Sequence, residues 1–375
     1  MIKNALVWSL IVFATAGNNL RAQVTTTAVP FVLIAPDSRN AGMGEAGVGM
    51  ADDVWAIHWN SAGYAFQTGS ELGFSHVNWL PQFGFSDLWI AHAAYKLPVQ
   101  ELDGTIAVGL TYLNLGEITR TATSGPEPIG SYKAYEFAIA VGYATRITEN
   151  VGFGISMKLI RSALAEDAGA GSATGSYEPG AGAATGFAFD VGILYKPQSF
   201  QIPFTSIDFG NALSFGASLS NIGPKLTYID RAQADPLPLN LRLGLAAKVL
   251  ESEINNITVI TDFTRLLVHR DSTKADEFYK GIFSTWTGGT TSDQLKQFNV
   301  GMGIEYWYGA PKLLALRWGF FYEDPNAGNR KFMTFGAGLR FDIYGFDFSY
   351  ISALEAQHPL GETLRFSASI GLGGN

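Results

Sequence analysis

The sequence contains no cysteine among its 375 residues. This absence excludes disulfide bridges, thiolate metal sites and a cysteine nucleophile, and it is compatible with an exported protein that folds without oxidation. Charged residues are also scarce, because they make up only 15% of the chain. An average soluble domain has roughly 25% charged residues. The chain is therefore short of the groups that keep a globular surface hydrated.

Clusters of basic residues are absent as well, and the net charge is −8. Such a chain offers no patch that could neutralise phosphates, which argues against a nucleic-acid partner. The five histidines are scattered without the spacing of a metal site, and the sequence holds no G-x-S-x-G nucleophile motif. We therefore predict a non-enzymatic protein with no catalytic residue, no cofactor and no metal, and leave a lipid-modifying enzyme as a minor alternative.

Long apolar runs are missing, with one short exception near the start of the chain. Lys3 precedes an apolar run over residues 5–16, and the small residue Ala22 closes the polar stretch that follows. The run is shorter than the roughly 20 residues that span a bilayer, so we expect a signal peptide over residues 1–22. Because no later stretch has eighteen consecutive apolar residues, the sequence argues against a helical membrane protein.

Glycine and aromatic residues are abundant, with 43 Gly, 26 Phe, 15 Tyr and 8 Trp. Since glycine costs about 1 kcal/mol in a helix interior, this composition favours strands and turns. In residues 105–112, Ile106, Val108 and Leu110 alternate with small residues such as Ala107. Side chains of a strand point alternately to opposite faces, so this segment has one bulky apolar face and one small face. The same alternation recurs as far as residue 372.

These alternating strands could belong to a β-sandwich or to a membrane barrel. Their small faces carry Gly, Ala, Ser and isolated charges such as Asp190 and Asp347, which we interpret as lumen-wall charges paired with Arg. Aromatic residues near strand ends, such as Trp89 and Tyr195, are typical of the girdles at membrane interfaces. Because an open sheet edge is costly in lipid, we predict an all-β, closed, transmembrane antiparallel barrel over residues 69–375.

About fourteen strand segments can be counted. The odd-numbered connections include the long stretches 115–133, 163–182 and 268–297, whereas most even-numbered ones are short. This asymmetry is expected for long outer loops and short periplasmic turns. The connection 197–211 is the exception, so the count is open by one hairpin.

Gly42, Gly44 and Gly47 have the spacing of the dinucleotide-binding fingerprint G-x-G-x-x-G. That fingerprint requires a preceding strand, a following helix and an acidic residue about 20 positions later, and this frame is missing. We instead predict that residues 23–68 form a plug in the barrel lumen. Glycine would permit the close backbone turns that such a plug makes against the wall.

Aromatic and apolar residues also occur in two expected outer loops. Such residues either pack among themselves or anchor a partner, and both interpretations stay open. The candidates for partner contact are Leu80, Phe83 and Phe85 in the first outer loop and Phe278, Tyr279, Phe283 and Trp286 in the loop 268–297.

Residues 30–66, "PFVLIAPDSRNAGMGEAGVGMADDVWAIHWNSAGYAF", resemble the N-terminal signature of the PorV family, outer-membrane components of the type IX secretion system. That signature runs through S-R, M-G, G-V and H-W-N before Y-A-F, and the family's proline after W-N is Ser61 here. The matching positions that we take as the plug motif are Ser38, Arg39, Gly42, Gly44, Gly47, Trp59 and Asn60.

The resemblance implies a FadL-like barrel of fourteen strands with a plugged lumen, embedded in the lipid of the outer membrane of a Gram-negative bacterium. It implies a non-catalytic role: binding the C-terminal signal domains of secreted cargo, associating with the SprA-type translocon barrel, and passing cargo to the PorU-type attachment protein. The FadL-like plan and the apolar first loop leave an alternative, an outer-membrane transporter of hydrophobic small molecules.

Overall fold

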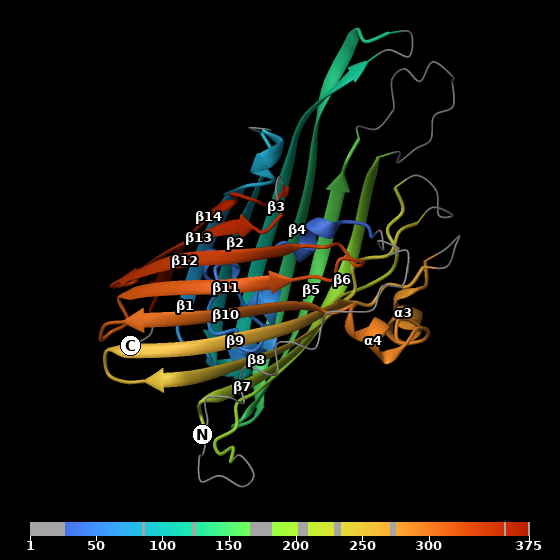
Figure 1. Cartoon of the computed structure of the whole chain (residues 1–375). Helices are drawn as coiled ribbons and strands as arrows, with labels where there is room; N and C mark the ends of the chain where they lie inside the picture. The colour runs from blue at the N-terminus through green and yellow to red at the C-terminus, as the bar shows by residue number, and fades with distance from the viewer. Residues whose placement is uncertain are drawn as a thin grey trace.

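The computed structural model describes residues 27–84, 87–121, 125–165, 182–201, 209–228, 234–270, 275–355 and 358–373. It is a closed antiparallel barrel in which each strand pairs with its neighbours along the chain and β1 closes on β14 (Figure 1). The predicted fold class, a barrel of fourteen strands with an N-terminal plug, is confirmed. The predicted signal peptide, residues 1–22, lies outside the described residues.

The strands are β1 (Ser70–Asn78), β2 (Trp89–Val99), β3 (Gly104–Thr121), β4 (Pro128–Thr148), β5 (Val151–Ala163), β6 (Ala183–Tyr195), β7 (Leu213–Ile222), β8 (Asn240–Glu251), β9 (Asn255–Leu266), β10 (Asn299–Tyr308), β11 (Leu314–Tyr322), β12 (Lys331–Phe341), β13 (Tyr344–Ala353) and β14 (Leu364–Leu372). Short helices lie before and between them: η2 (Pro30–Leu33), α1 (Ser38–Ala41), α2 (Ala56–Trp59), η3 (Ser61–Phe66), η4 (Pro81–Phe83), η5 (Gln100–Leu102), α3 (Phe278–Ser284) and α4 (Thr291–Leu295). None of these helices has the length and apolar character needed to cross a membrane.

The alternation along each strand separates an outer face from an inner one. In β3, Val108 and Leu110 are exposed on the outside of the barrel, whereas Ala107 is buried on the inside. The bulky face therefore points outward, where lipid would cover it, and the small face points into the lumen. Because the side chains that face the lumen are small, a segment of the polypeptide fits inside the barrel.

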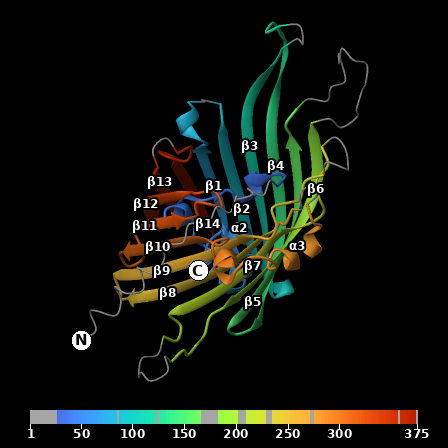
Figure 2. The ribbon, with the colours of Figure 1, turned by 45° about the vertical axis from the view of Figure 1, so that its right-hand side comes forward.

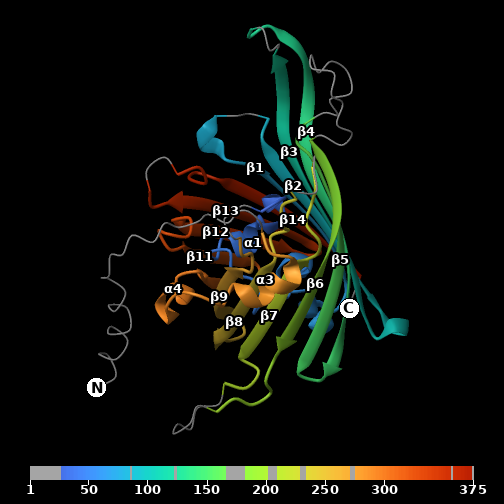
Figure 3. The ribbon, with the colours of Figure 1, turned by 90° about the vertical axis from the view of Figure 1, so that its right-hand side faces the viewer.

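Residues 28–67, which we call the plug, occupy the lumen. Figures 2 and 3 show this blue segment enclosed by the strands. Its apolar side chains, including Trp55, Ile57 and Tyr64, pack against small wall residues such as Ala94 and Ala107. The plug is therefore part of the hydrophobic core. A lumen filled only with water would have no such packed core.

The two rims of the barrel differ as expected. The loop that holds α3 and α4 connects β9 to β10 at one rim, and most connections at the other rim are turns of a few residues. The interpretation of residues 115–133 as a loop is wrong, because β3 and β4 continue their pairing past a bulge and project beyond the barrel as a two-stranded ribbon (Figure 1). The count of fourteen strands is confirmed, and the connection after Tyr195 is a long one at the short-turn rim.

Candidate functional site

The three glycines of the fingerprint lie where the plug meets the barrel wall. Gly44 has a φ of +70°, and a Cβ on it would overlap the carbonyl oxygens of Met302 and Phe320 in two adjacent strands. A Cβ on Gly47 would overlap the indole ring of Trp59, and Gly42 forms the C-cap of α1. The glycines are thus required by positive φ and by close approach, which is a structural use and not a phosphate cradle.

Arg39 ties the plug to the wall through ion pairs. Its Nε and Nη2 atoms donate to the two carboxylate oxygens of Glu305 on β10 at 2.7 and 2.8 Å. Its Nη1 atom also donates to Asp52 at 2.6 Å and to Asp53 at 3.0 Å within the plug. Arg317 on β11 donates to the same Glu305 at 2.9 Å. A buried guanidinium is thereby surrounded by carboxylates, which offsets the cost of desolvating it.

The cluster continues along the lumen wall. Arg317 also donates to Asp347 at 2.8 Å, and Arg340 donates to Asp347 at 2.7 Å. Asp347 is thus paired with arginine, as expected, whereas Asp190 is paired with Lys158 at 2.8 Å. Sequence reasoning had not paired Glu305 with the plug. In the sequence, Glu305 is recognisable only as an isolated charge on the small face of a strand.

Backbone amides of the plug are also bonded to side chains on several strands of the barrel. The amide of Ser38 donates to Ser367 Oγ on β14 at 2.8 Å, and the amide of Gly44 donates to Thr334 Oγ1 on β12 at 2.9 Å. The amides of Gly47 and Val48 both donate to the carboxylate of Asp262 on β9, at 2.7 and 2.8 Å. These bonds join the plug backbone to three strands of the wall, β9, β12 and β14.

Trp59 and Asn60 complete the plug motif. The Trp59 indole Nε1 donates to Asp37 at 2.8 Å, and the Asn60 amide donates to the carbonyl oxygen of Ile193 on β6 at 2.9 Å. Asp37 also caps α1 by accepting from the amide of Asn40 at 2.7 Å. Burial, reinforced by the nearby Asp53, raises the pKa of Asp37 to about 7, although both hydrogen bonds oppose this shift.

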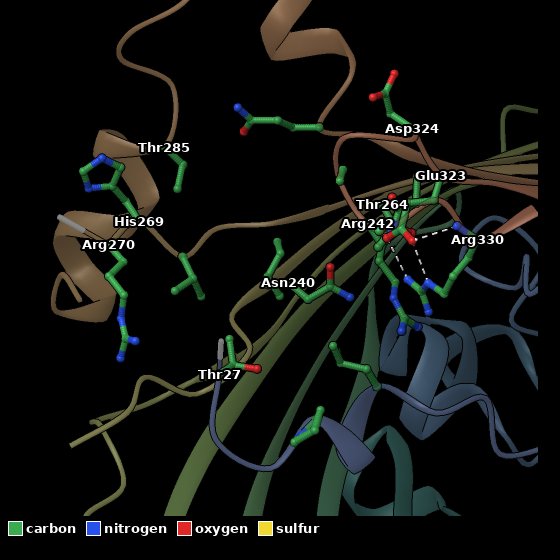
Figure 4. Close-up of a pocket in the computed structure, with 18 of the residues that line it drawn as sticks. Thr27, Asn240, Arg242, Thr264, His269, Arg270, Thr285, Glu323, Asp324 and Arg330 are labelled. Carbon is green, nitrogen blue, oxygen red and sulfur yellow. Dashed lines mark hydrogen bonds and ion pairs between the residues drawn. The ribbon is translucent and has the colours of Figure 1, made fainter. Parts of the chain in front are cut away.

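A cavity of about 1810 Å³ lies between the plug and the long-loop rim. Its lining includes Val29, Phe31 and Ile34 of the plug together with residues of the loop that holds α4. In Figure 4, Arg242, Glu323 and Arg330 lie together at one end of the cavity, and His269 and Arg270 lie at the other. The plug is therefore the floor of an outward-facing chamber.

Ion pairs line this chamber. Arg330 donates from Nε and Nη2 to the two carboxylate oxygens of Glu323 at 2.8 and 3.0 Å, as Figure 4 shows. Arg270 pairs with Asp235 at 2.6 Å near the other end. Within the ranges that the structure describes, no group of three or more His, Asp or Glu side chains has the arrangement of a metal site.

The outer-loop candidates divide into exposed and packed residues. Phe83 (54% exposed), Tyr279 (54%) and Phe283 (74%) present their rings at the rim. Trp286 is also exposed (44%), although one face of its ring stacks on the Arg265 guanidinium, 3.9 Å from the ring centroid. Leu80 and Phe278 are half-buried, the latter edge-to-face with Tyr279, and Phe85 lies outside the described residues.

The structure does not bring the two groups of loop candidates together. The turn Pro81–Phe83 and helix α3 lie on different sides of the barrel mouth (Figures 1 and 3). The exposed rings therefore lie at two separate places on the rim. Tyr279 and Phe283 belong to α3, a short helix that the sequence pattern had not predicted.

Comparison with known proteins gives a family and a fold. A family model described as "Type IX secretion system protein PorV" matches residues 17–273. No curated protein matches the sequence. A TodX monoaromatic hydrocarbon channel mutant superimposes with a TM-score of 0.50 at 15% identity, covering 90% of this chain and 97% of that one.

Two further solved structures resemble the chain less closely. The Pseudomonas putida toluene transporter TodX has a TM-score of 0.49 at 15% identity, covering 93% of this chain and 97% of its own. A Pseudomonas aeruginosa FadL homologue has a TM-score of 0.49 at 12% identity, covering 90% and 98%. At these identities the likeness concerns the fold alone.

Proposed function

The chain belongs to the family of the type IX secretion system protein PorV, and on this premise we propose that it receives secreted cargo at the outer membrane without catalysing a reaction. It lies in the outer membrane of a Gram-negative bacterium. In this role the barrel binds the C-terminal signal domain of cargo, associates with a SprA-type translocon barrel, and passes cargo to a PorU-type attachment protein.

The family match is the observation that carries this proposal. It covers the plug and the first nine strands, and with them much of the chamber wall, including Leu113, Glu136 and Arg242. A fixed plug under an outward-facing chamber supports a receptor, because cargo can dock without passing through the lumen.

Exposed aromatic rings at the mouth support a protein partner. Phe83, Tyr279 and Phe283 are large, exposed aromatic side chains on outer loops, where a partner can reach them. Aromatic residues of this kind dominate the binding energy of many protein interfaces. We assign them to contacts with the translocon barrel or with cargo.

Affinity purification of the native, detergent-solubilised barrel tests the proposal. We expect a much larger outer-membrane barrel, together with proteins that end in a signal domain, to be recovered with it. Recovery of the barrel alone, in repeated purifications with mild crosslinking, would contradict the proposal. A second abundant outer-membrane barrel from the same cells, tagged in the same way, controls for nonspecific co-purification.

Transport of a hydrophobic small molecule is the second candidate, because Val29, Phe31 and Ile34 give the chamber an apolar floor. This candidate requires the plug to move, whereas the structure ties it to several strands. Uptake of a labelled hydrocarbon by cells with and without the gene tests it. Equal uptake would exclude transport as the main role.

A further inference from the structure

Glu136 is a buried acid on the inner face of β4, in the wall of the chamber, and is only 5% exposed. Across the sheet it lies opposite Leu113 of β3 and Ser162 of β5. The next inner-facing residue of β4 towards the short-turn rim is Ala138, which belongs to the same hydrophobic cluster as Phe31 of the plug. Glu136 therefore lies one layer of side chains above the floor of the chamber.

Hydroxyl groups are the polar neighbours of this carboxylate. Ser162 Oγ accepts a hydrogen bond from the phenol of Tyr228 at 2.9 Å, and the Ser162 hydroxyl is the hydrogen-bonding neighbour of Glu136. A serine hydroxyl has one proton to donate, whereas a carboxylate offers about four acceptor positions. Neither oxygen of Glu136 is among the buried side-chain atoms that are sealed off without a partner. Acceptor positions thus remain available on the chamber side.

Glu136 differs from the other acids that line the chamber. Among the described residues, no cation and no backbone amide acts on its carboxylate. Each of the other lining acids has such a partner: Arg330 for Glu323, Arg270 for Asp235, the group of Arg242, Arg330 and Arg365 for Glu45, and backbone amides of their own loops for Asp293 and Asp324.

The missing partner has an energetic consequence. A carboxylate that is buried without a cation is unfavourable, because it has lost water and gained no opposite charge. A positively charged ligand in the chamber would relieve this cost without displacing a cation of the protein. The chamber wall is therefore prepared for a cation at Glu136 and at no other lining acid of the described residues.

The apolar surroundings limit what can carry the positive charge. Leu113 lies beside Glu136, and Leu164 and Phe31 line the same chamber. A calcium ion takes about six to eight oxygen ligands, which these side chains do not supply. An ammonium group on an apolar stem can instead lay its stem along such a surface while its head reaches the carboxylate.

An ammonium also fits better than a guanidinium. The planar fork of a guanidinium pairs best with both oxygens of a carboxylate, whereas an ammonium is a compact charge that one oxygen can bind. Because Ser162 is bonded to Glu136, the carboxylate is not free on both sides. The site therefore favours a primary ammonium.

We propose that Glu136 binds a primary ammonium group on an apolar stem, and that the stem packs against Leu113 and Phe31. The bound group supplies the cation that the chamber wall lacks at this position. A lysine side chain of a docked polypeptide and a free organic amine share this chemistry. The inference concerns the chamber alone, so it does not depend on the proposed function.

A single cysteine can report occupancy of the site, because the chain has none of its own. Leu164 lines the chamber two residues beyond Ser162, so Leu164→Cys places a thiol on the same side of the wall as Glu136. The full-length barrel is purified in nanodiscs of phosphatidylcholine, which has no net charge. The rate at which neutral methyl methanethiosulfonate modifies the thiol is then measured by mass spectrometry.

Four probes compete with the reagent in two matched pairs. Phenethylammonium is compared with its neutral counterpart 2-phenylethanol, and the peptide acetyl-Leu-Lys-Leu-amide is compared with acetyl-Leu-Gln-Leu-amide. Each probe is titrated against Leu164→Cys alone and against Leu164→Cys combined with Glu136→Gln or with Glu117→Gln. The last substitution removes the same charge from the exposed part of β3, away from the chamber lining.

We expect at least one charged probe to protect the thiol at a concentration about tenfold or more below that of its neutral counterpart, the scale of one charge-assisted hydrogen bond. Glu136→Gln keeps the shape of the side chain and removes its charge, so it should abolish this preference. Glu117→Gln should leave the preference unchanged. Stronger protection by the lysine peptide than by phenethylammonium would identify a polypeptide side chain as the source, and the reverse order a free amine.

Several outcomes would overturn the inference. Equal protection by charged and neutral probes would mean that Glu136 carries a proton in place of a ligand. A preference that survives Glu136→Gln would assign the cation to another acid of the chamber. A thiol that is modified but protected by none of the probes, or not modified at all, would mean that no such site is accessible. Each of these failures leaves the proposed function standing, because none of them concerns cargo or the translocon.

Discussion

Arg39 of the plug and Glu305 of β10 form a two-bond ion pair inside the barrel, with N–O distances of 2.7 and 2.8 Å. The two residues are separated by 266 positions in the sequence. Arg317 shares Glu305, so the plug is joined to a cluster of charges that runs along the wall. This relationship makes the plug part of the folded barrel.

Arg39→Met should destabilise the seating of the plug, because it removes the cation and leaves Asp52 and Asp53 without it. Breaking one partner of a buried ion pair costs roughly 3–5 kcal/mol. The guanidinium chloride midpoint of the barrel in detergent, together with protease digestion of residues 30–66, measures the effect. We expect a lower midpoint and cleavage within the plug.

Arg340→Met is the matched control, since Arg340 pairs with Asp347 at the partly exposed end of the same cluster. Among the described residues, its hydrogen bonds go to the barrel wall and not to the plug. A partly exposed ion pair contributes about 1 kcal/mol or less. Equal effects of the two substitutions would show that Arg39 does not hold the plug.

Gly44→Ala and Gly84→Ala form a second matched pair. Both glycines have a φ of +70°, but Gly84 has open space around its Cα, whereas a Cβ on Gly44 overlaps strand backbone. The left-handed conformation costs alanine roughly 1–2 kcal/mol at either position. In the same denaturation experiment, Gly44→Ala should lower the stability of the barrel substantially more than Gly84→Ala. Comparable losses of stability would contradict the close packing of plug and wall.

The pH dependence of plug opening follows from Asp37. Its pKa of about 7 in the plug lies above its usual value, so the folded plug favours the protonated form. The resulting contribution to stability is complete below about pH 4 and is lost as the pH rises through 7. Between pH 6 and 8 the free energy that favours the closed plug should fall by about 1 kcal/mol. This loss changes the opening equilibrium by up to tenfold.

Hydrogen exchange of the amides in α1, corrected for the intrinsic effect of pH, measures this change. Asp37→Asn cannot ionise and should show a much smaller loss of protection over the same interval. An equal loss in both proteins would assign the pH dependence to another group.

Phe283→Ala should weaken recovery of the partner barrel or cargo at least fivefold, since truncating an interface anchor costs more than about 1 kcal/mol. Heat-modifiable migration on gels should remain normal, because Phe283 is exposed. Phe341→Ala is the control, with the same substitution at a residue that is 70% exposed at the short-turn rim. Equal recovery with both variants would show that the partner does not contact α3 through Phe283.

Trp286→Ala should behave differently from Phe283→Ala. Its ring lies over the Arg265 guanidinium, so the substitution should loosen the loop as well as weaken partner recovery. Limited proteolysis between β9 and β10 distinguishes the two effects. A loop as resistant as that of the unsubstituted protein would mean that the stacking contributes little.

Period-two alternation predicted the barrel well, because side-chain direction in a strand depends only on position along the chain. Val108 and Ala107 lie on the faces that the pattern assigns. The exact ends of β3 and β4 were missed, since polar residues such as Glu117 and Lys133 continue a ladder whose side chains are not buried in lipid.

The site was harder to predict than the fold. The glycine spacing marked the plug, but the barrel-wall partners of Arg39 and Ser38, Glu305 and Ser367, lie hundreds of residues away. An isolated charge in the sequence carries no information about such a partner.

The central claim is that the barrel works with its plug in place, and a disulfide lock tests it most directly. The chain has no cysteine, and the hydroxyls of Ser38 and Ser367 lie 2.9 Å apart, so Ser38→Cys with Ser367→Cys offers a single pair that can bridge plug and β14. Cells that carry the oxidised, fully locked protein should secrete and attach cargo at the rate of cells with the unsubstituted protein. Loss of secretion on oxidation, restored by a reductant, would show that the plug must move and would contradict the account.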